Sequence, residues 1–295
     1  MKTILVPIDF TQTAQKGLDY ALMLTKNSAS SIVLLNIWNL PETHPSMSFT
    51  LHDVVREQNE KAMQDLIEKI KSQVENKSLK LEGIVDTGNI VYLVKNTAKA
   101  INADLIVMGT EGASGFKEVF IGSNAGGVME HAPCPVLAVP NEIKIRMPEK
   151  ILFATNFEVQ DISRLKKLIT WFKPFKCSFS IIHVGDQQHR DLNDFEDFII
   201  TAREKIAPES FNYSYLSNEN VQQGIEEYIK ENNIDLISMS ARKHTFFQQL
   251  FNRSLTKKIA YHTSVPLISF PVENQDKKME KEKEKETERT QEVAF

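Results

Sequence analysis

The chain is poor in cysteine, with only Cys134 and Cys177 in 295 residues. They lie far apart and form no C-x-x-C or Cys/His spacing, which argues against a disulfide scaffold or a structural zinc site. No apolar run approaches the roughly 18 residues that cross a bilayer, since stretches such as Ile4–Ile8 have the length of a strand. We therefore expect a protein of a reducing cytoplasm that makes no membrane span.

The chain also lacks a large charge of one sign. Its formal net charge is -4 and its pI is near 6.0. Nucleic-acid binding needs a basic field that releases counterions, so the composition argues against DNA or RNA as a partner. The opening residues Met1–Asp9 reach a proline and an acid too early for the apolar region of a signal peptide, and we expect no export.

A length of 295 residues predicts about two domains, and an internal repeat identifies them. An offset of 131 places Asp104–Met108 on Asp235–Met239 and gives ten identities over residues 104–140, where about two are expected by chance. At the front of each copy the offset is 147 and places Ile4–Phe10 on Ile151–Phe157. The second copy is therefore 16 residues shorter, between its second and fourth strands.

Each copy alternates segments of strand and helix pattern, which predicts βαβ units and a parallel sheet. The short apolar runs indicate strands covered by helices on both faces. We predict an α/β fold with two doubly wound, five-stranded, flavodoxin-like domains at residues 1–146 and 147–274. In the first copy we expect strands near 4–8, 32–38, 79–85, 104–108 and 135–139, helices near 13–26, 52–74, 90–101 and 124–131, and a loop over 39–50.

The last 21 residues differ in composition from the rest. Residues 275–295 carry six Lys or Arg and seven Asp or Glu, with almost no apolar residue before Val293. Such a segment cannot bury enough apolar surface to order itself. We expect a solvated tail, either disordered or a charge-laced helix that packs on nothing.

A glycine-rich segment follows the fourth strand. Gly109, Gly112, Gly122 and Ser123 form the pattern G-2x-G-9x-G-S, in which Gly109 directly follows the strand and Gly122-Ser123 opens the next helix. Glycines allow a close backbone approach, and the free N–H groups of a helix's first turn attract anions. The pattern predicts a phosphate cradle, although glycines that only make turns are the open alternative. It is neither a Walker loop nor the Rossmann dinucleotide fingerprint.

This pattern, placed before Pro-Cys-Pro-Val-Leu-Ala-Val-Pro, resembles the nucleotide-binding members of the universal stress protein family. The resemblance extends over residues 1–274, with Ile-Leu-Val-Pro-Ile-Asp-Phe-Thr in the first-strand position, so the chain resembles two such domains in tandem. It implies a Rossmann-like fold of the adenine nucleotide alpha hydrolase type. It also implies pairing through the last strands, so 136–139 and 267–270 would form an intrachain pseudo-dimer that covers two sheet edges. A homodimer is open as well.

The resemblance implies that the first half binds ATP, with or without Mg²⁺. Asp9 matches the acid on the ribose and adenine side, the backbone of Ile37 contacts the adenine edge, and Met108 lies under the base. The amides that open the helix after Gly122 complete the phosphate cradle. No catalytic residue is implied, because the cradle has no evident base to orient water, and slow hydrolysis stays open. The implied contacts are Pro7, Asp9, Ile37, Met108, Gly109, Gly112, Gly122, Ser123, Asn124 and Ala125.

Two residues depart from the family's pattern at the phosphate end. Glu111 stands where the family often has a basic residue or His, and a carboxylate repels a triphosphate unless a cation intervenes. Ala125 stands where a hydroxyl residue commonly helps to hold phosphate. We therefore expect weaker ATP binding than the glycines alone predict. Glu111 is interpreted as a solvent-facing side chain, with a bridging magnesium as the alternative.

The second copy has lost this pattern. Ser240, Lys243 and Arg253 stand where the first copy has glycines, while Ser254 is kept and Asn156 takes the place of Asp9. Side chains there block the backbone approach to a phosphate. We expect a degenerate, structural copy; the alternative is an anion site built from side-chain charge, with Arg242, Lys243, His244 and Arg253 as its residues.

The other candidates have simpler interpretations. His131 and His262 fall at a helix C-terminus, where a partly charged imidazole complements the helix dipole, so we expect caps. Cys134, between two prolines, is expected to be a small buried residue. His44, His52, His183 and His189 show no ligand spacing.

Three hypotheses for function follow. The first is an adenine-nucleotide-binding regulator of the stress response. The second is a nucleotide-free interaction scaffold, in which both halves are structural and the charged tail or the 39–50 loop recruits a partner. The third is a binder of a lipid or metabolite. The intact glycines of the first copy favour the regulator, and Glu111 and Ala125 favour the scaffold.

Overall fold

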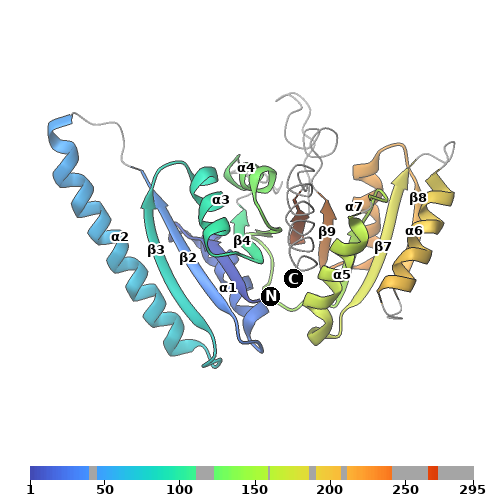
Figure 1. Ribbon diagram of the computed structural model, residues 1–295, viewed down its shortest axis with the longest axis horizontal. Helices are drawn as coiled ribbons and strands as arrows, with labels where there is room; N and C mark the ends of the chain where they lie inside the picture. The colour runs from blue at the N-terminus through green and yellow to red at the C-terminus, as the bar shows by residue number, and fades with distance from the viewer. Residues whose placement is uncertain are drawn as a thin grey trace, which may run out of the picture.

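The computed structural model of the chain is an α/β structure whose two halves lie side by side (Figure 1). It describes residues 1–39, 45–110, 123–158, 160–185, 191–206, 211–240 and 265–271. Within these ranges no helix is long and apolar enough to cross a membrane. The predicted charged tail, 275–295, lies outside the described residues.

Strands and helices alternate along both halves, as the sequence predicts. The first half contains β1 (Thr3–Pro7), α1 (Gln12–Thr25), β2 (Ser31–Trp38), α2 (Pro45–Gln73), β3 (Lys80–Thr87), α3 (Ile90–Ala100), β4 (Leu105–Thr110), α4 (Ser123–His131) and β5 (Val136–Pro140). The second half contains β6 (Lys150–Ala154), α5 (Asp161–Phe172), a 3₁₀ turn (Lys173–Phe175), β7 (Ser178–Gly185), α6 (Asp191–Lys205), β8 (Asn212–Ser217), α7 (Val221–Asn232), β9 (Leu236–Ser240) and β10 (Leu267–Phe270).

The predicted loop over 39–50 is partly wrong. Residues 45–50 are helical, and α2 begins at Pro45. Proline suits the first turn of a helix, because its fixed φ is helical and its missing N–H would have no intrahelical partner there. Pro45 therefore marks the start of a helix within the segment expected to be a loop. α2 has 29 residues and its counterpart α6 has 15, which accounts for most of the length difference between the copies.

The ten strands form one sheet in the order β3-β2-β1-β4-β5-β10-β9-β6-β7-β8. The expected flavodoxin-like order, in which β1 lies between β2 and β3, is wrong. Here β1 lies between β2 and β4, and β3 lies outside β2, which is the Rossmann-like order. All neighbours are parallel except β5 and β10, which run antiparallel with Leu137 opposite Ile268. The predicted pairing of the last strands is therefore present. From this junction outward the second half repeats the order of the first, so neither β5 nor β10 is left as an exposed edge.

Helices cover both faces of the sheet. The apolar side chains of α1, α2, α5 and α6 pack on one face, for example Leu18 and Leu165. Those of α3, α4 and α7 pack on the other, for example Val94 and Ile225. Alternate residues of each strand supply the two cores, which explains why the strands read as continuous apolar runs. Figure 1 shows α2 and α6 at the two outer ends.

Local devices recur at equivalent positions in the two halves. Asp104 Oδ2 accepts the backbone N–H groups of Lys2 and Thr3, at 2.7 and 3.1 Å. Asp235 Oδ2 does the same for Glu149 and Lys150, at 2.9 and 3.0 Å. The turn after the first strand of each half carries a phenylalanine at positive φ, Phe10 at 61° and Phe157 at 62°. Residues that the offsets of 131 and 147 align therefore share backbone geometry as well as residue type.

Candidate functional site

Five of the predicted contact residues meet at the carboxyl edge of the first half's strands. Pro7 ends β1, Asp9 follows it, Ile37 lies near the end of β2, and Met108 and Gly109 lie near the end of β4. β1 and β4 are neighbours in the sheet, and the chain order reverses direction between them. In open parallel sheets such a switch point leaves a crevice outside the strand ends.

Asp9 is exposed and has a local role. Its Oδ1 accepts hydrogen bonds from the backbone N–H of Thr11, at 3.0 Å, and from the Thr11 hydroxyl, at 2.6 Å. Thr11 in turn is the N-cap of α1, and its hydroxyl accepts the N–H of Ala14 at 3.2 Å. The turn therefore holds Asp9 in a fixed orientation at the strand end, where its carboxylate stays accessible.

Gly109 lies in a strand, which corrects the expectation that it opens a loop. It pairs with Val139 near the end of β4. A Cβ added to Gly109 would overlap the backbone carbonyl of Thr13, and one added to Gly17 would lie 2.6 Å from the nitrogen of Gly109. The two glycines therefore let α1 approach β4 closely. The close packing of α1 on β4 therefore explains the glycine at position 109 without any contact to a phosphate.

The remaining predicted contacts are only partly described. Gly112 and Gly122, together with Glu111, lie outside the described residues. Ser123 begins α4, as predicted, and places the first amides of this helix after the segment 111–122. Asn124 is exposed, and Ala125 is 4% exposed because its methyl group packs in the core. Ala125 can therefore offer a ligand only its backbone.

The second half has a cleft at the equivalent edge of its strands. The cleft encloses about 450 Å³ of empty space, including its open mouth. Through the two offsets, five lining residues are the counterparts of predicted first-half contacts: Ala154 of Pro7, Asn156 of Asp9, Val184 of Ile37, Met239 of Met108 and Ser240 of Gly109. The other lining residues are Thr155, Glu158, Asp161, Ile182, Val221 and Ile225.

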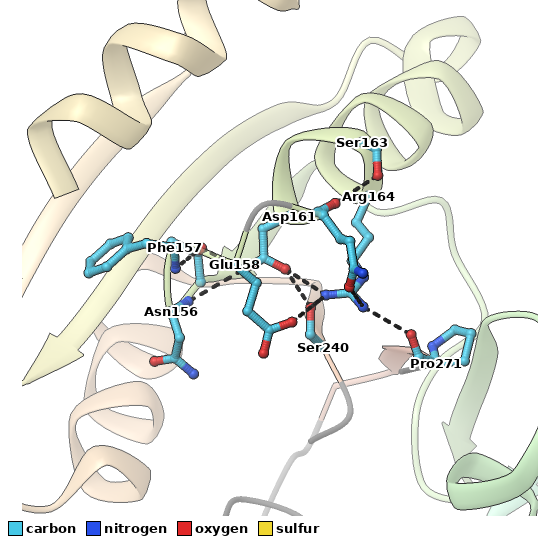
Figure 2. Close-up of polar contacts among 10 residues, drawn as sticks. Asn156, Phe157, Glu158, Asp161, Ser163, Arg164, Ser240 and Pro271 are labelled. Carbon is cyan, nitrogen blue, oxygen red and sulfur yellow. Dashed lines mark hydrogen bonds and ion pairs between the residues drawn. The ribbon is translucent and has the colours of Figure 1, made fainter. Parts of the chain in front are cut away.

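A buried ion-pair network forms one side of this cleft (Figure 2). Asp161 is 1% exposed, and its Oδ1 accepts Arg164 Nη1 at 2.9 Å and the Ser240 hydroxyl at 2.7 Å. Its Oδ2 accepts the Thr155 hydroxyl at 2.8 Å and the Asn156 N–H at 3.4 Å. The carboxylate of Asp161 therefore takes hydrogen bonds of the kind that an anionic ligand would receive at a strand end.

Arg164 is the centre of the same network and is 6% exposed. Its Nη1 also donates to Glu158 Oε2 and to the Ser240 hydroxyl, each at 2.8 Å. Its Nη2 donates to Gln160 Oε1 and to the carbonyl of Pro271, each at 3.0 Å. One guanidinium thus neutralises a buried carboxylate and ties α5 to the ends of β9 and β10.

Comparison with known proteins finds a family that matches the first half of the chain. Residues 1–140 match the Universal stress protein family. The universal stress protein YxiE of Bacillus subtilis (strain 168) is 29% identical over 143 residues, which are 46% of this chain and 97% of that protein. A putative universal stress protein of Staphylococcus aureus (strain USA300) is 26% identical over 144 residues, 48% of this chain and 85% of that protein.

The fold extends the likeness along the whole chain. The crystal structure of a universal stress protein from Archaeoglobus fulgidus DSM 4304 matches with a TM-score of 0.71 at 20% identity. The match covers 91% of this chain and 98% of that one. At this identity the likeness shows the fold, and it confirms the predicted α/β class with a mainly parallel sheet.

The network of Arg164 is the part of the site that sequence reasoning missed. By the offset of 147, Asp161 and Arg164 are the counterparts of Ala14 and Gly17 in the first half, and by the offset of 131 Ser240 is the counterpart of Gly109. The glycine pair that brings α1 onto β4 is thus replaced by an arginine and a serine that bond to each other. A position-by-position comparison of the two helices would have shown the paired change.

Two of the simpler interpretations are supported by geometry. His131 ends α4, and its Nδ1 lies 3.0 Å from the carbonyl oxygen of Gly127 in the last turn, as expected of a cap. Cys134 is 7% exposed, as predicted. His183 is buried, and its Nδ1 lies 2.8 Å from the Thr155 carbonyl oxygen. His262 lies outside the described residues.

Burial makes both thiols poor nucleophiles, which gives a testable result. Desolvation raises the pKa of Cys134 from 9.0 to about 12 and that of Cys177 to about 11. Because the thiolate is the reactive form, near pH 8 we expect alkylation about 10³-fold and about 10²-fold slower, respectively, than in the unfolded chain. Mass spectrometry after timed iodoacetamide treatment measures both rates, and Cys134 reacting as fast as Cys177 would contradict the assignment.

Proposed function

We propose that the chain is a tandem universal stress protein that binds an adenine nucleotide, ATP, at the carboxyl edge of its first half. Nucleotide binding there would regulate a stress response by changing stability or the choice of protein partner. The family match of residues 1–140 supports the assignment of the first half. The repeated strand order and the paired Asp104 and Asp235 devices support a second domain of the same kind, over 147–274.

The convergence of the predicted contacts is the observation that carries this proposal. Asp9 follows β1, Ile37 lies in β2 and Met108 in β4, so all three lie at the carboxyl ends of neighbouring strands, beside the switch point between β1 and β4. Asp9 is exposed there and is oriented by Thr11. The N-terminus of α4 follows on the same edge, and its first amides carry the positive end of a helix dipole. An adenine nucleotide offers matching groups: a base, a ribose with hydroxyls, and phosphates.

The location of the protein stays a prediction. Cys134 and Cys177 are free thiols, the state that a reducing cytoplasm maintains. We propose a cytoplasmic protein on this ground and on the composition.

The proposal is tested by releasing and titrating nucleotide. Protein purified without added nucleotide is denatured and the released small molecules are analysed, and ATP is then titrated with and without magnesium. We expect adenine nucleotide in the released fraction or saturable ATP binding below millimolar concentration. Finding neither would favour the nucleotide-free scaffold, with both halves structural.

Two substitutions identify the half that binds ATP. Gly122→Arg places a long side chain in the predicted cradle, and we expect it to lower ATP affinity by at least about 100-fold, since a side chain there blocks the backbone approach. Lys243→Gly changes the equivalent position of Gly112 in the second half and should leave ATP affinity unchanged. Loss of ATP binding in Lys243→Gly alone would assign the site to the second half.

A further inference from the structure

Among the residues that the structure describes, the cleft of the second half offers an ionic ligand no charged side chain outside the Arg164 network. Glu158 and Asp161 are its charged lining residues among those described, and both bind Arg164, which lies behind them. Both oxygens of Asp161 accept hydrogen bonds from the protein. A phosphate would therefore meet two carboxylates at short range, where like charges repel strongly. A cation would have to displace Arg164 from the carboxylates.

One part of the wall of the cleft is apolar. It consists of Ile182 and Val184 from β7, Val221 and Ile225 from α7, and Met239 from β9. Aliphatic walls and a methionine thioether pack well against the faces of a flat ring. This wall favours a ligand with an apolar, ring-shaped body.

One polar group remains available at the cleft. Asn156 is exposed, and Figure 2 shows its amide pointing away from the Arg164 network. An amide offers two donors and an acceptor, so it pairs with the uncharged edge of a heterocycle or with ribose hydroxyls. At the equivalent position the first half has Asp9, a charged acceptor. The two halves therefore present different chemistry at the same place in the fold.

From these observations we infer that the cleft of the second half binds an uncharged purine nucleoside and excludes its phosphorylated forms. The choice of a purine rests on the proposed function, because the lining residues are counterparts of the proposed adenine contacts. The exclusion of phosphate rests on Glu158, Asp161 and Ser240 alone. The two halves would then sense the nucleoside and the nucleotide separately.

The test uses a matched pair of cleft-filling substitutions in the full chain. Val221 and Ile90 are the first residues of α7 and α3, each follows an asparagine N-cap, and both are half-buried. Ile90→Phe should obstruct the first half and Val221→Phe the second. Adenosine, AMP and ATP are titrated by calorimetry against each single variant and against the double variant, after thermal unfolding has shown that each is folded.

We expect Ile90→Phe to bind adenosine saturably and AMP at least about tenfold more weakly, a difference equivalent to about 1.4 kcal/mol. Adding Val221→Phe should abolish adenosine binding. The inference is overturned if Ile90→Phe binds AMP or ATP as tightly as adenosine, if it binds no adenosine at millimolar concentration, or if adenosine binding survives in the double variant. ATP binding to Val221→Phe alone reports on the first half, so failure of the proposed function is seen separately.

Discussion

Gly109→Ala is expected to destabilise the protein by at least about 3 kcal/mol. The new Cβ would overlap the backbone carbonyl of Thr13, and no side-chain rotation relieves a clash with backbone. α1 would have to move away from β4 and lose part of the packing around Leu18, which is fully buried. Overpacking a tight core costs about 1–3 kcal/mol, and a clash with backbone falls at or above the upper end. Urea unfolding followed by circular dichroism measures the change.

Gly83→Ala is the matched control, since Gly83 also lies in a strand of the first half. Its added Cβ would meet atoms of the flexible Met63 side chain, which can change rotamer. We expect a change within about 1 kcal/mol. Equal destabilisation by the two substitutions would mean that the close approach of α1 to β4 is not what requires Gly109. Because of this packing role, loss of ATP binding in Gly109→Ala would not identify a phosphate contact, and Gly122 is the better test position.

The strands were within reach of the sequence because they depend on local and repeated signals. The expected flavodoxin-like strand order was wrong, because the order depends on which strands pair across the sheet. Runs such as Ile32–Leu35 have strand length and are apolar on both faces. The family resemblance implied that Val136–Val139 and Leu267–Phe270 would pair, and they do. The start of α2 was missed because proline occurs both in loops and in the first turn of a helix, so Pro45 alone does not distinguish the two.

The site was less predictable because its contacts are not local. The pattern of glycines located Gly109 correctly at the strand end, but its neighbour Gly17 is 92 residues away, and nothing near Gly109 in the sequence reveals that α1 packs there. Likewise Arg164 and Ser240 are 76 residues apart, and the sequence identified only Ser240, as a lost glycine. Only the three-dimensional structure shows that Gly17 lies against Gly109 and that Arg164 bonds to Ser240.

The two halves have different side chains between the first helix and the strand that it packs on. In the first half two glycines let the backbones of α1 and β4 pack directly against each other. In the second half the side chains of Asp161, Arg164 and Ser240 lie between α5 and β9 and satisfy one another. The second half therefore holds a buried carboxylate where the first half has close backbone packing.

Arg164→Met is expected to destabilise the second half by about 3–5 kcal/mol. Methionine keeps the length of the side chain but leaves the carboxylate of Asp161, which is 1% exposed, without its counter-charge. Removing one partner of a buried pair costs this much because the other charge stays desolvated. The substitution also removes the hydrogen bond to the Pro271 carbonyl, so hydrogen exchange should rise in β10, next to its junction with β5.

The control restores the first half's residues. Arg164→Gly combined with Asp161→Ala and Ser240→Gly reproduces Gly17, Ala14 and Gly109, and leaves no buried carboxylate unpaired. If charge balance governs stability, this triple variant should be more stable in urea than Arg164→Gly alone, although it carries two more substitutions. If instead the triple variant is less stable than Arg164→Gly, the network acts mainly by filling space between α5 and β9. In that case we expect the triple variant to bind an anion no better than the unchanged second half does. The non-additive gain expected from residues that share one network distinguishes the two cases.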